Sequence, residues 1–177
     1  MKTVYWDSCV FHALFSEEKG RVDVCRKVIA AAERGELQIY TSAITSVEVV
    51  WIKNLDRMSP DHEEKIQKFF EHKFIRIITC DRGISAEARR LLWQYPKLKP
   101  KDAIHVASAI SQTVDVMHTY DDDDLVKPLS EKIGNPPMRI CHPEYVGQTA
   151  PPPRPHSPEL PLSAPAQAAR RIPPRAE

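Results

Sequence analysis

Val4-Tyr5-Trp6-Asp7-Ser8, close to the N-terminus, is a run of three large apolar residues that an aspartate ends. A short apolar run of this kind predicts a buried strand. A buried strand needs neighbours, so the fold depends on the segments that come after it along the chain. Similar apolar runs recur downstream, and helical patterns separate them.

The body of the chain alternates predicted strands with predicted helices. Strands are expected at 4–6, 37–40, 74–78 and 114–119, with a weaker fifth at 138–141. Helices are expected at 22–34, after a turn within 41–54, and at 60–73, 84–95 and about 102–112. Strands that helices separate require crossover connections. The sequence therefore predicts an α/β fold with a central, mostly parallel sheet covered on both faces.

The composition fits one domain with some additional chain. The 177 residues are enough for one domain of ordinary size and too few for two well-developed ones. Lys and Arg total 25 and Asp and Glu 24, so the formal net charge is +1. This balance gives no global electrostatic footprint for nucleic acid, and any such contact has to come from a local patch.

The sequence also predicts how the chain relates to membranes and secretion, and whether its cysteines are free. The sequence has no run of about 18 apolar residues, which excludes a membrane-spanning helix. Asp7 interrupts the first apolar run too early for a signal peptide. We therefore expect a cytoplasmic protein with no membrane contact and free cysteines. Cys9, Cys80 and Cys141 lie in or beside apolar runs and are expected in the core.

The composition changes near residue 150. Nine of the 16 prolines fall between Pro151 and Pro174, in a segment with few apolar residues and no periodicity. Such a segment cannot bury enough surface to offset the entropy of ordering itself. We therefore predict a folded domain over residues 1–147 and a flexible, partly polyproline II tail over residues 148–177.

Acidic residues follow the predicted strands. Asp7 ends the first strand, Glu48 lies in the helix after the second, and Asp102 begins a later helix. Four consecutive aspartates, Asp121 to Asp124, follow the fourth strand. The carboxyl ends of parallel strands meet at one edge of a sheet, where open α/β folds collect their ligands. We therefore expect carboxylates from four distant parts of the chain to converge.

A cluster of carboxylates requires compensation. Two of them about 4 Å apart repel by roughly 4 kcal/mol at an effective dielectric near 20. Either one is protonated or a cation binds, and hard oxygen ligands suit Mg²⁺ or Mn²⁺. Such an ion keeps water ligands and can engage phosphate oxygens, so the natural chemistry is phosphodiester hydrolysis.

Each acid also has an ordinary structural interpretation. Glu48 lies three residues after Thr45, which fits a capping box. Asp102 fits a helix N-cap or a favourable N-terminal charge. Asp7 fits an Asx-turn, and the four aspartates fit a solvated acidic loop. Only their joint placement favours a metal site.

At these residues the sequence resembles the PIN-domain family, in particular VapC-like toxin ribonucleases. The matching pieces are Val4 to Ser8, Thr45 to Val49, Lys101 to Ala109 and Thr119 to Leu125. The resemblance covers about residues 2–145. It implies a three-layer α/β/α fold with a central parallel sheet, and an endoribonuclease that depends on Mg²⁺ or Mn²⁺. For a toxin of a type II toxin–antitoxin pair it also implies an RNA substrate, a cognate antitoxin and often a homodimer.

The resemblance assigns the metal-binding and catalytic acids to positions of this sequence. Asp7, Glu48, Asp102 and Asp121 match the family's acids, and Asp124, before Leu125, matches a second acid in the last motif. Four consecutive aspartates leave open which of them completes the site. We expect Asp7 and Asp102 to hold the ion most directly, and Glu48 and Asp121 to complete the site or to orient its water ligands. Ser8 and Thr119 match hydroxyl positions that support metal-bound water.

Other residues near the expected site have two interpretations each. Lys99 and Lys101 either approach RNA phosphates or are solvated loop residues. Trp51 and Lys53 either line an RNA groove or, for Trp51, pack in the core. His105 follows Asp102 by three residues, and a packing or surface role is expected for it.

Three other functions compete with the nuclease, and one of them, a purely structural interaction protein, would give no reason for the acids to converge. A phosphotransferase of the haloacid-dehalogenase type also carries an Asp after its first strand, but its chemistry needs Asp-x-Asp, and Cys9 occupies the second position. The main alternative is a catalytically silent PIN-like module that binds RNA or protein. The presence of all four acids argues against that alternative.

Overall fold

A computed structural model describes residues 1–50 and 60–144 of the chain. The C-terminal part of the helix expected within 41–54, with Trp51 and Lys53, lies outside the described residues. The proline-rich tail at 148–177 lies outside them as well.

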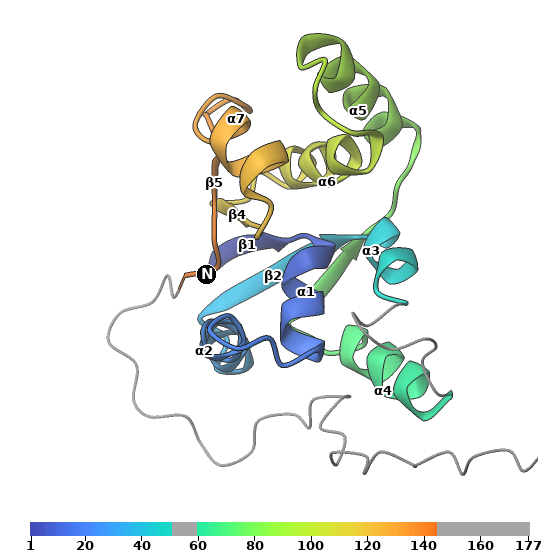
Figure 1. The fold of residues 1–177 in the computed structure, drawn as a ribbon, viewed down its shortest axis with the longest axis vertical. Coiled ribbons are helices and arrows are strands. Elements are labelled where there is room, and N and C mark those ends of the chain that lie inside the picture. Colours follow the sequence, from blue (N-terminus) through green and yellow to red (C-terminus); the bar gives the residue numbers. More distant parts are fainter. Residues whose placement is uncertain (51–59, 145–177) are drawn as a thin grey trace, which may run out of the picture.

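Five parallel strands form one sheet (Figure 1). They are β1 (Lys2–Trp6), β2 (Leu37–Ser42), β3 (Ile75–Ile78), β4 (Val116–His118) and β5 (Arg139–Cys141), in the spatial order β3-β2-β1-β4-β5. The first strand is therefore central, and β1 pairs with β2 on one side and with β4 on the other. The all-parallel arrangement confirms the predicted α/β fold, since each connection returns through a helical segment.

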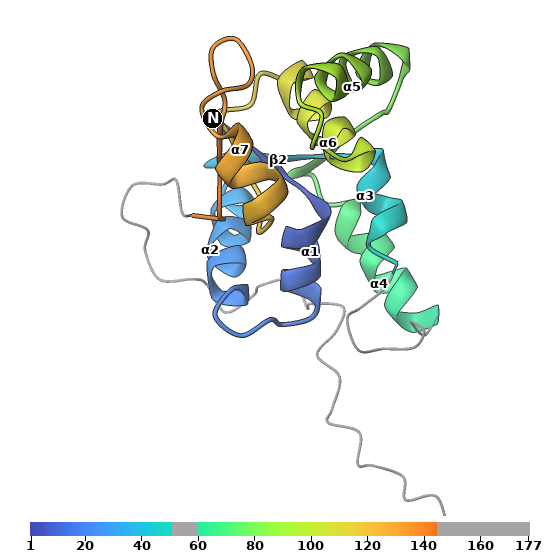
Figure 2. The ribbon, with the colours of Figure 1, turned by 45° about the horizontal axis from the view of Figure 1, so that its top comes forward.

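Helices cover both faces of the sheet. Their bounds are α1 (Ser8–Phe15), α2 (Val22–Glu33), α3 (Ala43–Glu48), α4 (Pro60–Phe70), α5 (Arg82–Gln94), α6 (Pro100–Ser111), the π-helical turn η1 (Asp122–Val126) and α7 (Lys127–Leu129). In Figures 1 and 2, α1, α2 and α4 lie on one side of the sheet, and α5, α6 and α7 lie on the other. The result is the three-layer α/β/α architecture.

The alternation of side chains along β1 divides the core into two clusters. Val4 and Trp6 pack with α1, α2 and α4, whereas Tyr5 packs with α5, α6 and α7. All three side chains are fully buried. The apolar run at 4–6 is therefore continuous because both faces of this strand are covered.

Several local predictions differ from the structure. The helices α1 and α7 and the turn η1 were not expected, because they have only 8, 3 and 5 residues and are too short for a helical pattern to stand out in the sequence. The helix expected within 41–54 ends at Glu48 among the described residues. Cys80 is exposed, contrary to the expectation of a core position, while Cys9 and Cys141 are half-buried. Cys80 follows the end of the edge strand β3, where no layer covers it.

All four cysteines are free, as expected. Within residues 1–50 and 60–144, the helices are not long and apolar enough to span a lipid bilayer.

Candidate metal centre

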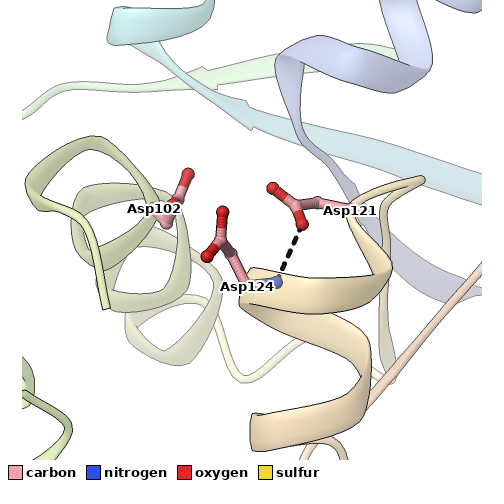
Figure 3. A group of neighbouring side chains, drawn as sticks. All are labelled: Asp102, Asp121 and Asp124. Atoms are coloured by element: carbon pink, nitrogen blue, oxygen red, sulfur yellow. Dashed lines mark hydrogen bonds between the residues drawn. The ribbon is translucent and has the colours of Figure 1, made fainter. Parts of the chain in front are cut away.

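Three aspartates gather at the carboxyl edge of the sheet (Figure 3). One carboxylate oxygen from each of Asp102, Asp121 and Asp124 lies within 4.8 Å of the others. Asp102 comes from the first turn of α6, and Asp121 and Asp124 come from the turn that follows β4. Two segments that are distant in sequence thus bring their carboxylates together.

The acidic run has a defined conformation. Asp121 is the N-cap of η1, and its Oδ1 accepts a hydrogen bond of 2.9 Å from the backbone N–H of Asp124. The hydroxyl of Thr119 accepts a second bond of 2.9 Å from the backbone N–H of Asp121. These bonds fix the turn, so Asp121 and Asp124 face Asp102. Asp122 and Asp123 instead pair with His142 and Lys127.

Asp102 carries the unusual electrostatics of this group. Its Oδ2 is buried and has no hydrogen-bond partner among the described residues. Burial, and next the negative charge of Asp121, raise the pKa of the Asp102 carboxyl to about 6. The charges of His105 and Lys99 favour the ionised form, but they do not outweigh burial and the neighbouring acids, and a buried carboxylate oxygen without a hydrogen bond is costly. The three aspartates offer hard oxygen donors, and Oδ2 of Asp102 is buried without a hydrogen bond. Together these features fit a divalent cation such as Mg²⁺ or Mn²⁺.

A lysine neutralises part of the cluster. The ammonium of Lys99 forms an ion pair with Asp124, and this contact raises the pKa of Lys99. The Lys99 side chain is 65% exposed. An exposed pair of this kind contributes little to stability, so the lysine can exchange Asp124 for another anion at low cost.

Asp7 lies beside the cluster but makes different contacts. It is buried and caps α1, accepting hydrogen bonds from the backbone N–H of Cys9 at 3.0 Å and from the Cys9 thiol at 2.7 Å. The same thiol lies 3.4 Å from the hydroxyl of Thr119, on the neighbouring strand end. Burial raises the pKa of Asp7. Asp7 is not part of the three-aspartate group.

Glu48 is held by a histidine and a lysine. Its carboxylate oxygens lie 2.7 Å from Nε2 of His105 and 3.2 Å from Nζ of Lys101. Burial alone would raise the pKa of Glu48, but contacts with His105, Lys101 and Ser8 outweigh it and lower the pKa to about 2. Glu48 therefore stays ionised, and it contacts the residues next to Asp7 and Asp102 without joining the three-aspartate group.

His105 was not expected to take part in this arrangement. It is buried, and its Nδ1 lies 2.7 Å from the hydroxyl of Tyr5 on β1. Both ring nitrogens are therefore engaged, and the ring joins β1, α6 and α3. The signal in the sequence was its position one helical turn after Asp102, which places both residues on neighbouring parts of the same face.

The structure also decides among the simpler interpretations of the acids. The capping box at Thr45 is wrong, because Ser42 caps α3 and the Thr45 hydroxyl lies 2.7 Å from that of Thr41. Asp102 is not an N-cap, since Lys99 occupies that position, but it does lie in the first turn of α6. Asp7 does bond the backbone that comes after it, as an Asx-turn residue would.

Two solved structures are similar to this chain. VapC20 of Mycobacterium tuberculosis, described as a sarcin–ricin loop cleaving toxin, is 13% identical over 68% of this chain and 91% of that chain, with a TM-score of 0.53. A chain in a toxin–antitoxin complex from Klebsiella pneumoniae is 24% identical over 71% of this chain and 92% of that chain, with a TM-score of 0.49. At 13% identity, the similarity to VapC20 shows a shared fold and nothing beyond it.

No curated protein sequence matches this chain significantly. A family model does match: the model of the PIN domain aligns with residues 4–127, a segment that contains β1 to β4 and all five acids singled out in the sequence. The chain belongs to the PIN domain family.

Proposed function

We propose that this protein is an endoribonuclease that hydrolyses RNA phosphodiester bonds with Mg²⁺ or Mn²⁺ and acts as the toxin of a type II toxin–antitoxin pair. The observation that carries the proposal is the three-aspartate group with the unbonded, buried Oδ2 of Asp102. The description of VapC20 as a sarcin–ricin loop cleaving toxin supports RNA as the substrate class.

The chain's own carboxylates divide into two roles in this proposal. Asp102, Asp121 and Asp124 would hold the ion directly, since their oxygens already lie within 4.8 Å of one another. Asp7 and Glu48 would orient water at the edge of the site, because each already has fixed hydrogen-bond donors. A bound divalent ion supplies Lewis acidity and a more acidic water.

Two lysines would position the substrate. Lys99 and Lys101 flank Asp102 in sequence, and each pairs with an acid of the site. Both side chains are about two-thirds exposed, at 65% and 67%. Ammonium groups on the rim of the site would exchange these carboxylates for RNA phosphates.

The test is cleavage of structured and unstructured RNAs with Mg²⁺, with Mn²⁺ or with EDTA. Asp102→Asn is expected to lower the rate by about 100-fold or more, as loss of a metal-site residue does. Asp122→Asn is the matched control, because it belongs to the same acidic run but pairs with His142 outside the group. Full activity in EDTA or in Asp102→Asn would exclude the proposal.

The second candidate is a catalytically silent PIN-like module that binds RNA or protein. The ion pairs of Lys99 and Lys101 favour it, because they partly neutralise the acids when no cation is bound. Calorimetric titration with Mn²⁺ separates the two candidates. Binding of Mn²⁺ together with RNA cleavage supports the nuclease, and intact RNA with or without Mn²⁺ binding supports the silent module.

We further propose a cytoplasmic protein whose cognate antitoxin blocks this site, and a homodimer as the working assembly. We also propose domain limits of 1–147, with residues 148–177 as a separate tail. Co-expression with the protein encoded by the neighbouring gene, followed by measurement of growth and of oligomeric mass, tests the partner and the assembly. Growth arrest that the neighbour does not relieve would exclude it as the antitoxin.

A further inference from the structure

A cavity of about 400 Å³ opens beside the acidic cluster, between the segment that follows α5 and the turn of α7. Its walls include Tyr95, Pro96 and Leu98 on one side and Pro128 and Leu129 on the other. Asp124, an acid of the proposed metal centre, belongs to its lining as well. The cavity and the cluster therefore share a residue and adjoin each other.

We propose that this cavity binds one unpaired nucleobase of an RNA substrate, on the nucleotide next to the phosphate that is cleaved. The inference rests on the proposed function and deepens it, because it gives the site a means of choosing where to cut. Apart from Asp123 and Asp124, the residues of this cavity were not among those that the sequence assigned to the site.

The lining suits the flat faces of a base. Proline rings, a tyrosine ring and leucine side chains present mostly carbon, and the volume falls within the about 300–1,000 Å³ of small-ligand sites. Unpaired bases in RNA are held by stacking on aromatic and apolar side chains. Pro96 and Pro128 are exposed and Tyr95 is half-buried, so this surface is open to a ligand from solvent.

The charges around the cavity favour a nucleotide over a purely apolar ligand. Lys97 lines the cavity and is exposed. The two carboxylates of the lining, Asp123 and Asp124, form ion pairs with Lys127 and Lys99. A nucleotide carries an apolar base and an anionic phosphate. An apolar interior with ammonium groups at its rim matches that distribution, and Asp124 connects the rim with the proposed metal centre.

Tyr95 is the cavity residue whose substitution tests the proposal. Its hydroxyl donates a hydrogen bond of 3.2 Å to the backbone carbonyl of Lys132, which fixes the ring against the segment after α7. Trp93, two residues earlier, is 78% exposed and is not part of the lining. Trp93 is therefore the matched control for Tyr95, because the Tyr95 side chain lines the cavity and the Trp93 side chain does not.

The experiment measures cleavage of a pool of randomised single-stranded oligoribonucleotides with Mn²⁺, read by sequencing the cut ends. Wild type is expected to prefer certain nucleotides at one position beside the cut. Tyr95→Ala should flatten that preference and raise KM about tenfold, with kcat nearly unchanged, because stacking holds the base without taking part in the chemistry. Trp93→Ala should behave as wild type.

A second variant protects the test against a folding defect. Pro96→Glu changes an exposed residue, so the fold is retained, and it brings a negative charge to the cavity wall. It should weaken the same nucleotide preference. Wild-type preference and KM in both variants, with melting curves that show folded protein, would overturn the inference while leaving the nuclease proposal intact.

Failure of the nuclease proposal is a separate outcome. If wild type cleaves no RNA, the cavity is tested by NMR titration with adenosine and cytidine 5′-monophosphates in EDTA. Chemical-shift changes confined to residues 95–98 and 128–129, and lost in Tyr95→Ala, would support a base site. Their absence would overturn it.

Discussion

At the scale of single residues, Asp102 lies in an electrostatically unfavourable position. Its Oδ2 is buried without a partner among the described residues, and Asp121 and Asp124 repel its charge. In the metal-free state, this charge lowers the stability of the folded protein. An isosteric amide at position 102 would remove the charge and could still occupy the same volume.

We therefore expect Asp102→Asn to stabilise the metal-free protein by about 1 kcal/mol at pH 7.5, as relief of strain at a functional site often does. Urea denaturation in EDTA measures the change. Asp23→Asn is the matched control, because Asp23 also lies in the first turn of a helix but is exposed and pairs with Arg26. The control should lose a little stability, since an N-terminal acid favours the helix dipole. A less stable Asp102→Asn protein would mean that the charge of Asp102 does not destabilise the metal-free fold.

His118 makes stability depend on pH. Burial lowers the pKa of His118 to about 4, and its Nδ1 accepts a hydrogen bond of 3.1 Å from Nε1 of Trp6. The proton of the neutral ring is therefore on Nε2, and a second proton would have to replace the Trp6 bond. The unfolded chain binds that proton near pH 6.5, so the folded state loses stability as the pH falls from about 6.5 to about 4.

The expected loss from His118 is about 3 kcal/mol between pH 7 and pH 4. His118→Gln keeps an acceptor for Trp6 but does not titrate. Comparing the pH dependence of unfolding for wild type and His118→Gln isolates the histidine, since other groups are common to both. Parallel curves for the two proteins would show that His118 titrates normally.

At the scale of elements, α6 organises the site. Asp102 faces the acids of η1, and His105 faces Glu48 of α3 and Tyr5 of β1. One helix thus connects the central strand with both neighbouring acidic segments. Because Tyr5 is fully buried, the position of His105 is set from the core and not from the surface.

Removing the Tyr5 hydroxyl should therefore weaken the contact between His105 and Glu48. We expect Tyr5→Phe to cost about 1–2 kcal/mol, because it leaves a ring nitrogen of His105 without its buried partner. In a double-mutant cycle, the loss of stability in the Tyr5→Phe, Glu48→Gln double variant should differ by about 1 kcal/mol from the sum of the losses in the two single variants.

Tyr40→Phe is the control for that cycle, because Tyr40 lies opposite Tyr5 on β2. It should change stability little and add independently to Glu48→Gln. Additive losses for Tyr5→Phe as well would mean that His105 does not couple the two residues.

At the scale of the whole molecule, the site joins parts that pack on one core cluster. The segments carrying Asp102, Asp121 and Asp124 cover the face of the sheet formed around Tyr5, Met117 and Ile140. Repulsion among the three acids acts between α6 and η1, so a bound cation should stabilise the fold as a whole. All three aspartates lie within the described residues.

We expect Mn²⁺ at about 100 times its dissociation constant to stabilise wild type by about 2.7 kcal/mol. Thermal unfolding with increasing Mn²⁺ measures the shift. Asp102→Asn should show almost none of it, and Asp122→Asn should show nearly all of it. An equal shift in Asp102→Asn would place the ion elsewhere.

The sequence predicted the arrangement of the sheet better than the contacts at its edge. The five strands were found because continuous apolar runs mark strands that are buried on both faces, and β1 is the clearest case. The helix α1 was missed, because it has only 8 residues and its apolar residues form an almost continuous run, in which a helical spacing does not stand out. Burial on several sides hides the period on which such predictions depend.

The candidate site was predicted in part. The sequence indicated that acids would gather where strands end, and it named Asp102, Asp121 and Asp124 among them. It also offered the Asx-turn bond that Asp7 makes with the backbone of α1, but it did not indicate that Glu48 would bond a buried histidine. That contact depends on distances between β1, α3 and α6, which no local pattern contains. The direct-ligand role of each acid therefore stays a prediction.

The order of the strands also has a consequence for synthesis on the ribosome. The strand translated first, β1, is central and remains open on one flank until β4, translated more than a hundred residues later, pairs with it. Nascent chain that ends before residue 121 lacks two of the three gathered aspartates and the turn that places them. A stalled or prematurely terminated product of that length therefore lacks the three-aspartate group, which can form only after Asp124 has been translated.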